Sequence, residues 1–219
     1  MNDVFFISGL GADRSVFKNI NLINCNAYFI ECPKRRENLS LSLPDYVKLI
    51  SRQIHVEDPI LIGLSFGGLI AQHLKNIVNP KLTILISSFE LPDELPTVSI
   101  YAKKLNLVDK IPNFLIPMFT PMHRYFFGPL SKEAISVLKP IIRNTDPLYF
   151  KWSLKRILEH KKDELDDSII RIHGLDDRLI PIKLENQDYI LGGSHFLVFD
   201  KGEELSRILN SIISGCEKI

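Results

Sequence analysis

The chain has 219 residues, of which 45% are hydrophobic and 24% are charged, a composition that fits one globular domain, or one core with an inserted subdomain, and excludes a largely disordered or fibrous protein. Lys and Arg together number 27 against 26 Asp and Glu, so the charge balance does not favour a polyanion and we expect no nucleic-acid partner. The three cysteines follow neither a disulfide framework nor the spacing of zinc ligands, which favours a reducing, cytoplasmic location and no metal site.

Short β-branched and aromatic runs alternate along the chain with longer helical patterns, as in a parallel sheet with crossover helices. Most of these runs are almost continuously apolar, which is typical of strands buried on both faces. They predict strands at residues 4–8, 27–31, 60–64, 82–87 and 168–173, with a shorter sixth at 189–191. The fold class is therefore α/β, with a mostly parallel sheet of about six strands and flanking helices.

Helical patterns lie at residues 44–55, 66–78 and 203–213. Residues 90–167 break the alternation, because they contain eight prolines and no convincing parallel strand. We interpret them as a helical insertion into a core formed by residues 1–89 and 168–219. No stretch reaches the roughly 18 to 20 apolar residues of a membrane span, so we expect none.

The motif Gly63-x-Ser65-x-Gly67 stands between a predicted strand and a predicted helix. This is the setting of a nucleophile elbow, in which a tight turn holds a serine in a strained backbone conformation and flanking glycines allow neighbouring chain to approach closely. The serine hydroxyl then lies at a helix N-terminus, where the dipole and free N–H groups favour a developing negative charge. Ser65 is therefore the candidate nucleophile.

A serine hydroxyl needs a base, and the downstream sequence offers one together with an acid. Asp177 lies in the sequence HGLDD directly after the fifth predicted strand, and His195 follows 18 residues later in the sequence GGSH. With these motifs in this order the chain resembles the α/β-hydrolase family, over essentially its whole length. The resemblance implies that Ser65 is the nucleophile, Asp177 the acid of an HGxxD pattern and His195 the general base.

The resemblance also implies an oxyanion hole made of two backbone N–H groups. One belongs to Phe66, directly after the nucleophile, and the other to Leu10, in the loop after the first strand. That loop carries Ser8 where the family usually has histidine, and we expect the change to weaken the geometry of the Leu10 donor. Family members usually have one or two further strands before this loop, so the resemblance implies an α/β-hydrolase fold reduced at its N-terminus, with residues 90–167 as a helical cap.

Other interpretations of these residues stay open from sequence alone. Ser65 could lie in a purely structural strand-to-helix turn, and His195 could be a surface loop histidine. Asp177 could cap a helix, or Asp176 could take its role. We interpret His173 as structural because it closes a predicted strand. The glycine-rich first loop matches a dinucleotide-binding loop poorly, and we expect no cofactor.

The insertion contains an apolar cluster between residues 114 and 127. Packing on the core would explain it, and part of it could also line an acyl or aromatic pocket over Ser65, for which Phe119, Met122 and Phe126 are the candidate substrate-binding residues. We therefore predict a serine hydrolase that cleaves a small to medium apolar carboxylic ester or thioester through an acyl-enzyme.

Other functions fit the same motifs. An acyltransferase, a lactonase or a carbon–carbon bond hydrolase would use the same triad, and nothing in the sequence separates them from an esterase or thioesterase. A non-catalytic ligand-binding or scaffold protein that retains the hydrolase fold is the alternative from a different class. The sequence does not indicate the oligomeric state.

Overall fold

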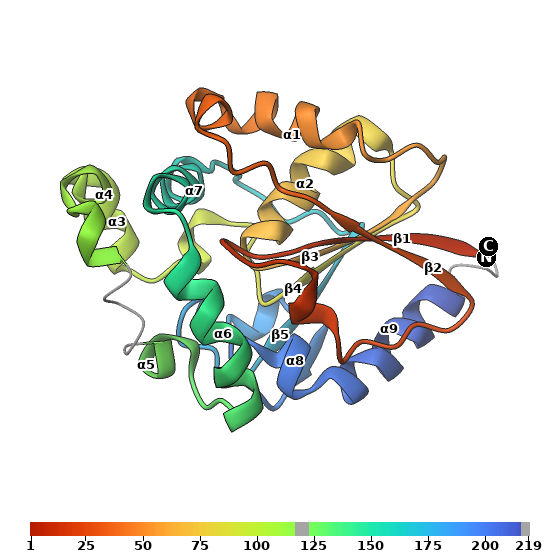
Figure 1. The fold of residues 1–219 in the computed structure, drawn as a ribbon. Coiled ribbons are helices and arrows are strands. Elements are labelled where there is room, and N and C mark those ends of the chain that lie inside the picture. The colour runs from red at the N-terminus through yellow and green to blue at the C-terminus, as the bar shows by residue number, and fades with distance from the viewer. Residues whose placement is uncertain (117–122, 216–219) are drawn as a thin grey trace.

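The computed structural model describes residues 1–116 and 123–215, and Figure 1 shows their arrangement. Six strands form a single sheet in which every neighbouring pair is parallel, so the predicted α/β architecture is confirmed. The strands are β1 (Asn2–Ile7), β2 (Cys25–Ile30), β3 (Ile60–Leu64), β4 (Leu82–Ile86), β5 (Ile169–Gly174) and β6 (Tyr189–Leu191). The helices are α1 (Leu43–Ser51), α2 (Phe66–Val78), α3 (Val98–Lys104), α4 (Leu107–Lys110), α5 (His123–Phe127), α6 (Lys132–Asn144), α7 (Pro147–Glu159), α8 (Leu197–Asp200) and α9 (Gly202–Gly215).

The strand order β2-β1-β3-β4-β5-β6 places a topological switch point between β1 and β3. From β1 the chain steps outward to β2, then returns to the other side of β1 and continues in one direction to β6. In open parallel sheets, ligands bind outside the carboxyl ends of the strands at such a point. The loops that follow β1 and β3 are therefore the expected position of a site.

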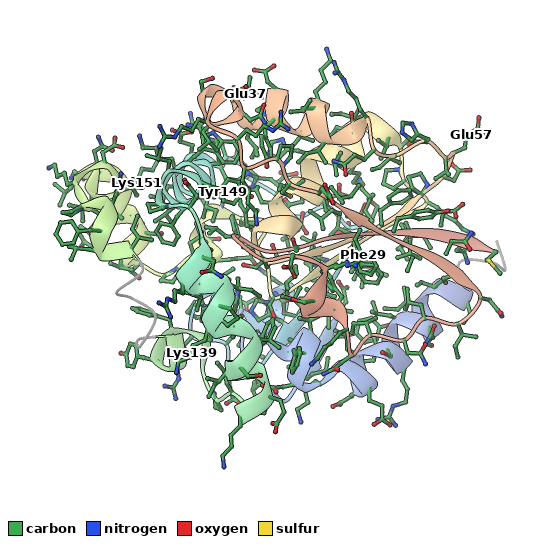
Figure 2. The ribbon with its side chains drawn as sticks, in the orientation of Figure 1. Phe29, Glu37, Glu57, Lys139, Tyr149 and Lys151 are labelled. Atoms are coloured by element: carbon green, nitrogen blue, oxygen red, sulfur yellow. The ribbon has the colours of Figure 1, made fainter. Side chains whose placement is uncertain are left out.

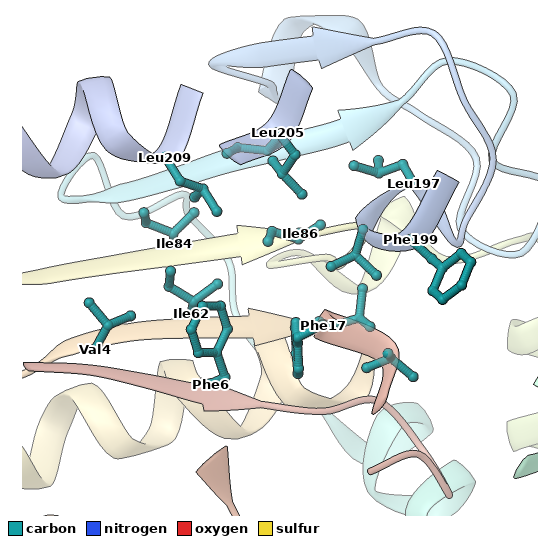
Figure 3. Close-up of a cluster of buried hydrophobic side chains, with 14 of the residues drawn as sticks. Val4, Phe6, Phe17, Ile62, Ile84, Ile86, Leu197, Phe199, Leu205 and Leu209 are labelled. Atoms are coloured by element: carbon teal, nitrogen blue, oxygen red, sulfur yellow. The ribbon is translucent and has the colours of Figure 1, made fainter. Parts of the chain in front are cut away.

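The sheet divides the core into two layers, because successive side chains of a strand point to opposite faces. On one face, strand residues such as Phe5 and Leu61 pack with side chains of α1, α2 and α7. Figure 3 shows the other face, where strand side chains pack against α8, α9 and the turn at residues 14–17. The figure labels Val4, Phe6, Phe17, Ile62, Ile84, Ile86, Leu197, Phe199, Leu205 and Leu209. Each fully buried aliphatic side chain contributes roughly 1.5 to 3 kcal/mol to folding, so the two layers hold the strand ends rigidly.

The elements that the structure describes within residues 90–167 are helices joined by loops, and these helices differ in how they pack. Ala134 and Leu138 of α6 belong to one core layer, whereas Tyr149 (labelled in Figure 2) and Trp152 of α7 belong to the other. The helix α3 buries none of its residues and lies with α4 at the outer edge of the molecule. The boundaries of a separate cap stay a prediction.

A buried carboxylate joins the beginning and the end of this segment. The side chain of Glu90 is fully buried and forms ion pairs with Lys162 and, at 2.9 Å, with Arg171 of β5. One of its oxygens also accepts a hydrogen bond from the backbone N–H of Asp166 at 3.2 Å. Burial of a carboxylate is tolerated only when it is paired and hydrogen-bonded, and these contacts provide both. We call this group of four residues the Glu90 clasp.

The first helix is shorter than its sequence pattern predicts, since α1 ends at Ser51 rather than at residue 55. The side chain of Gln53 accounts for the difference. Its amide accepts a hydrogen bond from the N–H of Glu31 and donates one to the carbonyl of Glu31, both at 2.9 Å. This pairing continues the edge strand β2 beyond its last residue, a tertiary contact that helical periodicity does not contain.

Candidate active site

Ser65 lies in the tight turn between β3 and α2, at φ 53° and ψ −120°. This strained conformation is imposed by close packing around it. A Cβ on Gly63 would come within 2.5 Å of the carbonyl oxygen of Gly67, and a Cβ on Gly67 within 2.2 Å of the carbonyl oxygen of Ile7. Only glycine fits at either position, and the turn therefore presents Ser65 at the carboxyl edge of the sheet, beside the end of β1.

The structure brings Ser65, His195 and Asp177 into one line of hydrogen bonds. The Oγ of Ser65 lies 3.0 Å from Nε2 of His195, and Nδ1 of His195 lies 2.7 Å from Oδ2 of Asp177. The histidine and the aspartate are buried, with 4% and 5% of their surface exposed. Because a carboxylate accepts only from a protonated nitrogen, Nδ1 carries the proton and Nε2 is free to accept one from Ser65.

The two oxygens of Asp177 have separate partners. Its Oδ1 accepts the backbone N–H groups of Leu179 and Ile180, each at 2.9 Å, whereas its Oδ2 faces His195. The helix-cap interpretation and the triad interpretation of this residue are thus geometrically compatible. Burial alone would raise the pKa of Asp177, but the electrostatic attraction of the His195 ring and hydrogen bonds from His173 and His195 outweigh it and lower the pKa to about 2.

The exposed residue Asp176 does not share this position. Its backbone N–H donates to the carbonyl of Gly193 at 2.8 Å, which ties the loop after β5 to the loop that carries His195. A Cβ on Gly174 would lie 2.5 Å from the same carbonyl oxygen, so the two loops pack backbone against backbone. These contacts fix the distance between Asp177 and His195.

The end of α5 contacts the histidine directly. The backbone N–H of His195 donates to the carbonyl of Phe127 at 2.9 Å, and the two rings meet edge to face with centroids 5.2 Å apart. Sequence reasoning placed Phe127 in an apolar cluster but not in the site. Of the predicted substrate-binding residues, Phe126 lies on α5 with 37% of its surface exposed, and Phe119 and Met122 lie outside the described residues.

The loop after β1 lies against the nucleophile, as its place at the switch point predicts. A Cβ on Gly9 would be in van der Waals contact with Ser65, 3.4 Å from its Cβ. Phe66 is the first residue of α2, so its N–H has no acceptor inside the helix. No hydrogen bond among the described residues uses the N–H of Leu10 or of Phe66. Both predicted oxyanion donors are thus available to a ligand.

Ser8 supports this loop in a way that its sequence position did not suggest. Its Oγ donates to the carbonyl of Ala12 at 3.1 Å, across the turn that Gly11 makes at φ 74°. Lys34, from the loop after β2, donates to the carbonyl of Gly11 at 3.1 Å. The loop is therefore held from both sides without the histidine that is usual in the family.

Ser88, just after β4, is a further residue that sequence reasoning missed. Its Oγ donates to the carbonyl of Ser65 at 2.7 Å, while the N–H of Ser65 donates to the carbonyl of Ile86 at 3.0 Å. Both backbone polar groups of the strained residue are thus satisfied by the neighbouring strand. No local sequence signal marks Ser88, because its role depends on the pairing of β3 with β4.

Comparison with solved structures gives neighbours that align with nearly the whole chain. A hydrolase from Oleispira antarctica has a TM-score of 0.75 at 16% identity, covering 98% of this chain and 91% of its own. An esterase from Thermogutta terrifontis has a TM-score of 0.68 at 12% identity, with 99% and 90% covered. The protein has the α/β-hydrolase fold. The RedJ thioesterase of the prodiginine pathway of Streptomyces coelicolor also shares this fold, with a TM-score of 0.66 at 13% identity and coverage of 96% and 89%.

No protein-family model and no curated protein matches the sequence. Within residues 1–116 and 123–215, the α/β-hydrolase core presents no group of three or more His, Cys, Asp or Glu side chains arranged to hold a metal ion. None of the described helices combines the length and the apolar character needed to cross a membrane.

Proposed function

We propose that this protein is a cytoplasmic serine hydrolase that cleaves a small to medium apolar carboxylic ester or thioester through an acyl-enzyme. The observation that carries the proposal is the line of hydrogen bonds from Ser65 through His195 to Asp177, with distances of 3.0 and 2.7 Å. A nucleophile in contact with a base, and that base in contact with a buried acid, is the arrangement that activates a serine hydroxyl.

In the first half of the reaction, Oγ of Ser65 attacks the carbonyl carbon while its proton moves to Nε2 of His195. The new C–O bond leaves a negative charge on the former carbonyl oxygen, and the N–H groups of Leu10 and Phe66 donate to it. The charge of Asp177 stabilises the imidazolium at the same moment. When the intermediate collapses, His195 returns the proton to the departing alcohol or thiol, and the acyl group stays on Ser65.

In the second half, water replaces the leaving group. His195 accepts a proton from water as its oxygen attacks the acyl carbon, and the same two N–H groups again bind the oxyanion. Collapse breaks the bond to Ser65, whose Oγ takes back the proton from His195. The products are a carboxylic acid and the free enzyme.

The substrate class is supported by the surroundings of the triad and by the neighbours in structure. The aromatic ring of Phe127 packs at right angles to the ring of His195, and two structure neighbours carry the names esterase and thioesterase. Because α5 comes from the segment 90–167, we propose that this segment acts as the cap and contributes apolar wall to the substrate site.

Reaction with a fluorophosphonate tests the proposal. Intact mass should show one adduct on the wild-type protein, peptide mapping should place it on Ser65, and Ser65→Ala should remove it. The matched control is Ser211→Ala, since Ser211 is exposed on α9 and lines a surface hollow with Asn2 at the start of β1, whereas Ser65 lies at the carboxyl edge of the sheet, so loss of the Ser211 hydroxyl should leave labelling unchanged. No adduct on folded wild-type protein would favour the non-catalytic binding protein instead.

Nitrophenyl esters of increasing acyl length then test the substrate class. A rise in kcat/KM from acetyl toward medium-length acyl groups supports an apolar pocket. A sharp preference for acetyl would contradict the apolar wall that we propose for the cap. Addition of alcohol acceptors separates hydrolysis from acyl transfer, since a transferase would make ester product at the expense of free acid.

A further inference from the structure

We infer that His173 is a positioning residue of this site, which holds the carboxylate of Asp177 in its working orientation and thereby sets the pH range in which His195 acts as a base. The inference rests on the proposed function. It assigns to His173 a role in the reaction, where its sequence position suggested only that it closes a strand.

His173 lies on β5 with 1% of its surface exposed. Its Nε2 is 2.9 Å from the carbonyl oxygen of Ile180 and 3.2 Å from Oδ2 of Asp177. Both oxygens can only accept, so Nε2 carries a proton that the two share. The loop residue Ile180 closes a ring of contacts, because its N–H donates to Oδ1 of Asp177 while its carbonyl accepts from His173.

The other nitrogen of the ring shows that packing alone does not explain this histidine. Nδ1 of His173 is buried and has no hydrogen-bond partner among the described residues. A buried polar atom without a partner destabilises the folded state, and an apolar side chain of similar volume would avoid that cost. An imidazole is needed here because its other nitrogen, Nε2, carries the N–H group that contacts Asp177 and Ile180.

His173 contacts Oδ2 of Asp177, the same oxygen that accepts the hydrogen bond from His195. Four N–H groups surround the carboxylate of Asp177, two at each oxygen, and this number matches its lone-pair sites. Among the described residues, the ionisable groups that contact Asp177 are His173 and His195. Because His173 draws negative charge away from Oδ2, it weakens the hold of Asp177 on a proton at His195. The base is then free at lower pH.

The test compares two substitutions of nearly equal shape. Gln places an amide N–H close to the position of Nε2, whereas Met fills the same volume without a donor. For His173→Met we expect the acidic limb of the kcat/KM profile to move up by roughly 0.5 to 1 pH unit and the plateau to fall about tenfold. KM should stay within about twofold, since His173 does not face the substrate. His173→Gln should keep the wild-type limb.

Fluorophosphonate labelling at each pH distinguishes failure of the positioning role of His173 from failure of the proposed hydrolase function. If the wild type labels at Ser65 but His173→Met and His173→Gln both keep its pH profile, the positioning role is overturned and the hydrolase stands. If the two variants shift equally, the N–H is not the cause and the inference fails as well. If the folded wild type does not label, the proposed function has failed first.

A measurement on the wild-type protein covers the case in which a variant does not fold. Nitrogen-15 NMR of the histidine rings should find a proton on Nε2 of His173, the nitrogen that faces Asp177 and Ile180. A neutral His173 with its proton on Nδ1 would overturn the inference.

Discussion

Replacement of Asp177 by Asn removes one charge from the proposed triad and leaves the side-chain shape unchanged. The carbonyl oxygen of the Asn amide must face the N–H groups of Leu179 and Ile180, because the reverse orientation would leave these two backbone donors unpaired at a cost of about 1 to 3 kcal/mol each. At the Oδ2 position, by contrast, His195 can move its proton to Nε2, and the N–H of His173 keeps the carbonyl of Ile180 as its acceptor. The NH₂ group then occupies the position of Oδ2, 2.7 Å from Nδ1 of His195.

An NH₂ group at this position donates to Nδ1, so the proton of His195 moves to Nε2. The histidine then donates to Ser65 and can no longer take its proton. Together with the loss of the negative charge that stabilises the imidazolium, we expect kcat to fall by about 10³ to 10⁴, equivalent to roughly 4 to 5.5 kcal/mol in the barrier.

The assay is hydrolysis of a nitrophenyl ester at the pH optimum, with circular dichroism to establish folding. Asp176→Asn is the matched control, because it removes the same charge one residue earlier from an exposed side chain, and it should stay within about twofold of wild type. A decrease of less than tenfold in folded Asp177→Asn would refute the tautomer argument. An equal loss in Asp176→Asn would show that the wrong aspartate was assigned.

Two further results are expected. The pKa of Asp177 is about 2, below its ordinary 3.8, so its ionised carboxylate contributes about 2 kcal/mol to the free energy of unfolding. This contribution is present above pH 4 and is lost as the pH falls toward 2. Urea titrations between pH 5 and 2.5 should show this loss of stability in the wild type and not in Asp177→Asn. Ser8→Ala removes the hydrogen bond to the carbonyl of Ala12, so we expect the free energy of unfolding to fall by about 0.5 to 1.5 kcal/mol. We also expect kcat to fall with little change in KM. An unchanged kcat would show that Ser8 does not position the Leu10 donor.

The elements closest to the nucleophile could be predicted from sequence because their determinants are local. An apolar run, two glycines around a serine and a helical pattern within 20 residues define β3, the turn at Ser65 and α2, which spans residues 66–78 as predicted. The parallel sheet was predicted as well, from apolar runs that alternate with helical patterns, whereas the order of its strands was not.

What sequence could not supply depends on contacts between distant segments. Ser88 meets Ser65 only because β3 and β4 pair in register, and Phe127 meets His195 only because α5 returns to the sheet edge. The compensation for the missing histidine at Ser8 depends on the positive φ of Gly11, which turns the loop back toward its own start. Single-residue patterns contain none of these distances.

The Glu90 clasp has a consequence for how such a protein can diversify. Glu90 forms an ion pair with Lys162 and accepts a hydrogen bond from the N–H of Asp166. These contacts hold the two ends of the segment 90–167 together independently of the length of chain between them. The entropy of closing a flexible loop grows only with the logarithm of its length, about 0.6 kcal/mol per doubling. Chain can therefore be inserted or deleted around α3 and α4, which bury little, with small effect on the elbow. With this segment as the cap that we propose, a change in its length would alter the substrate site and leave the position of Ser65 unchanged.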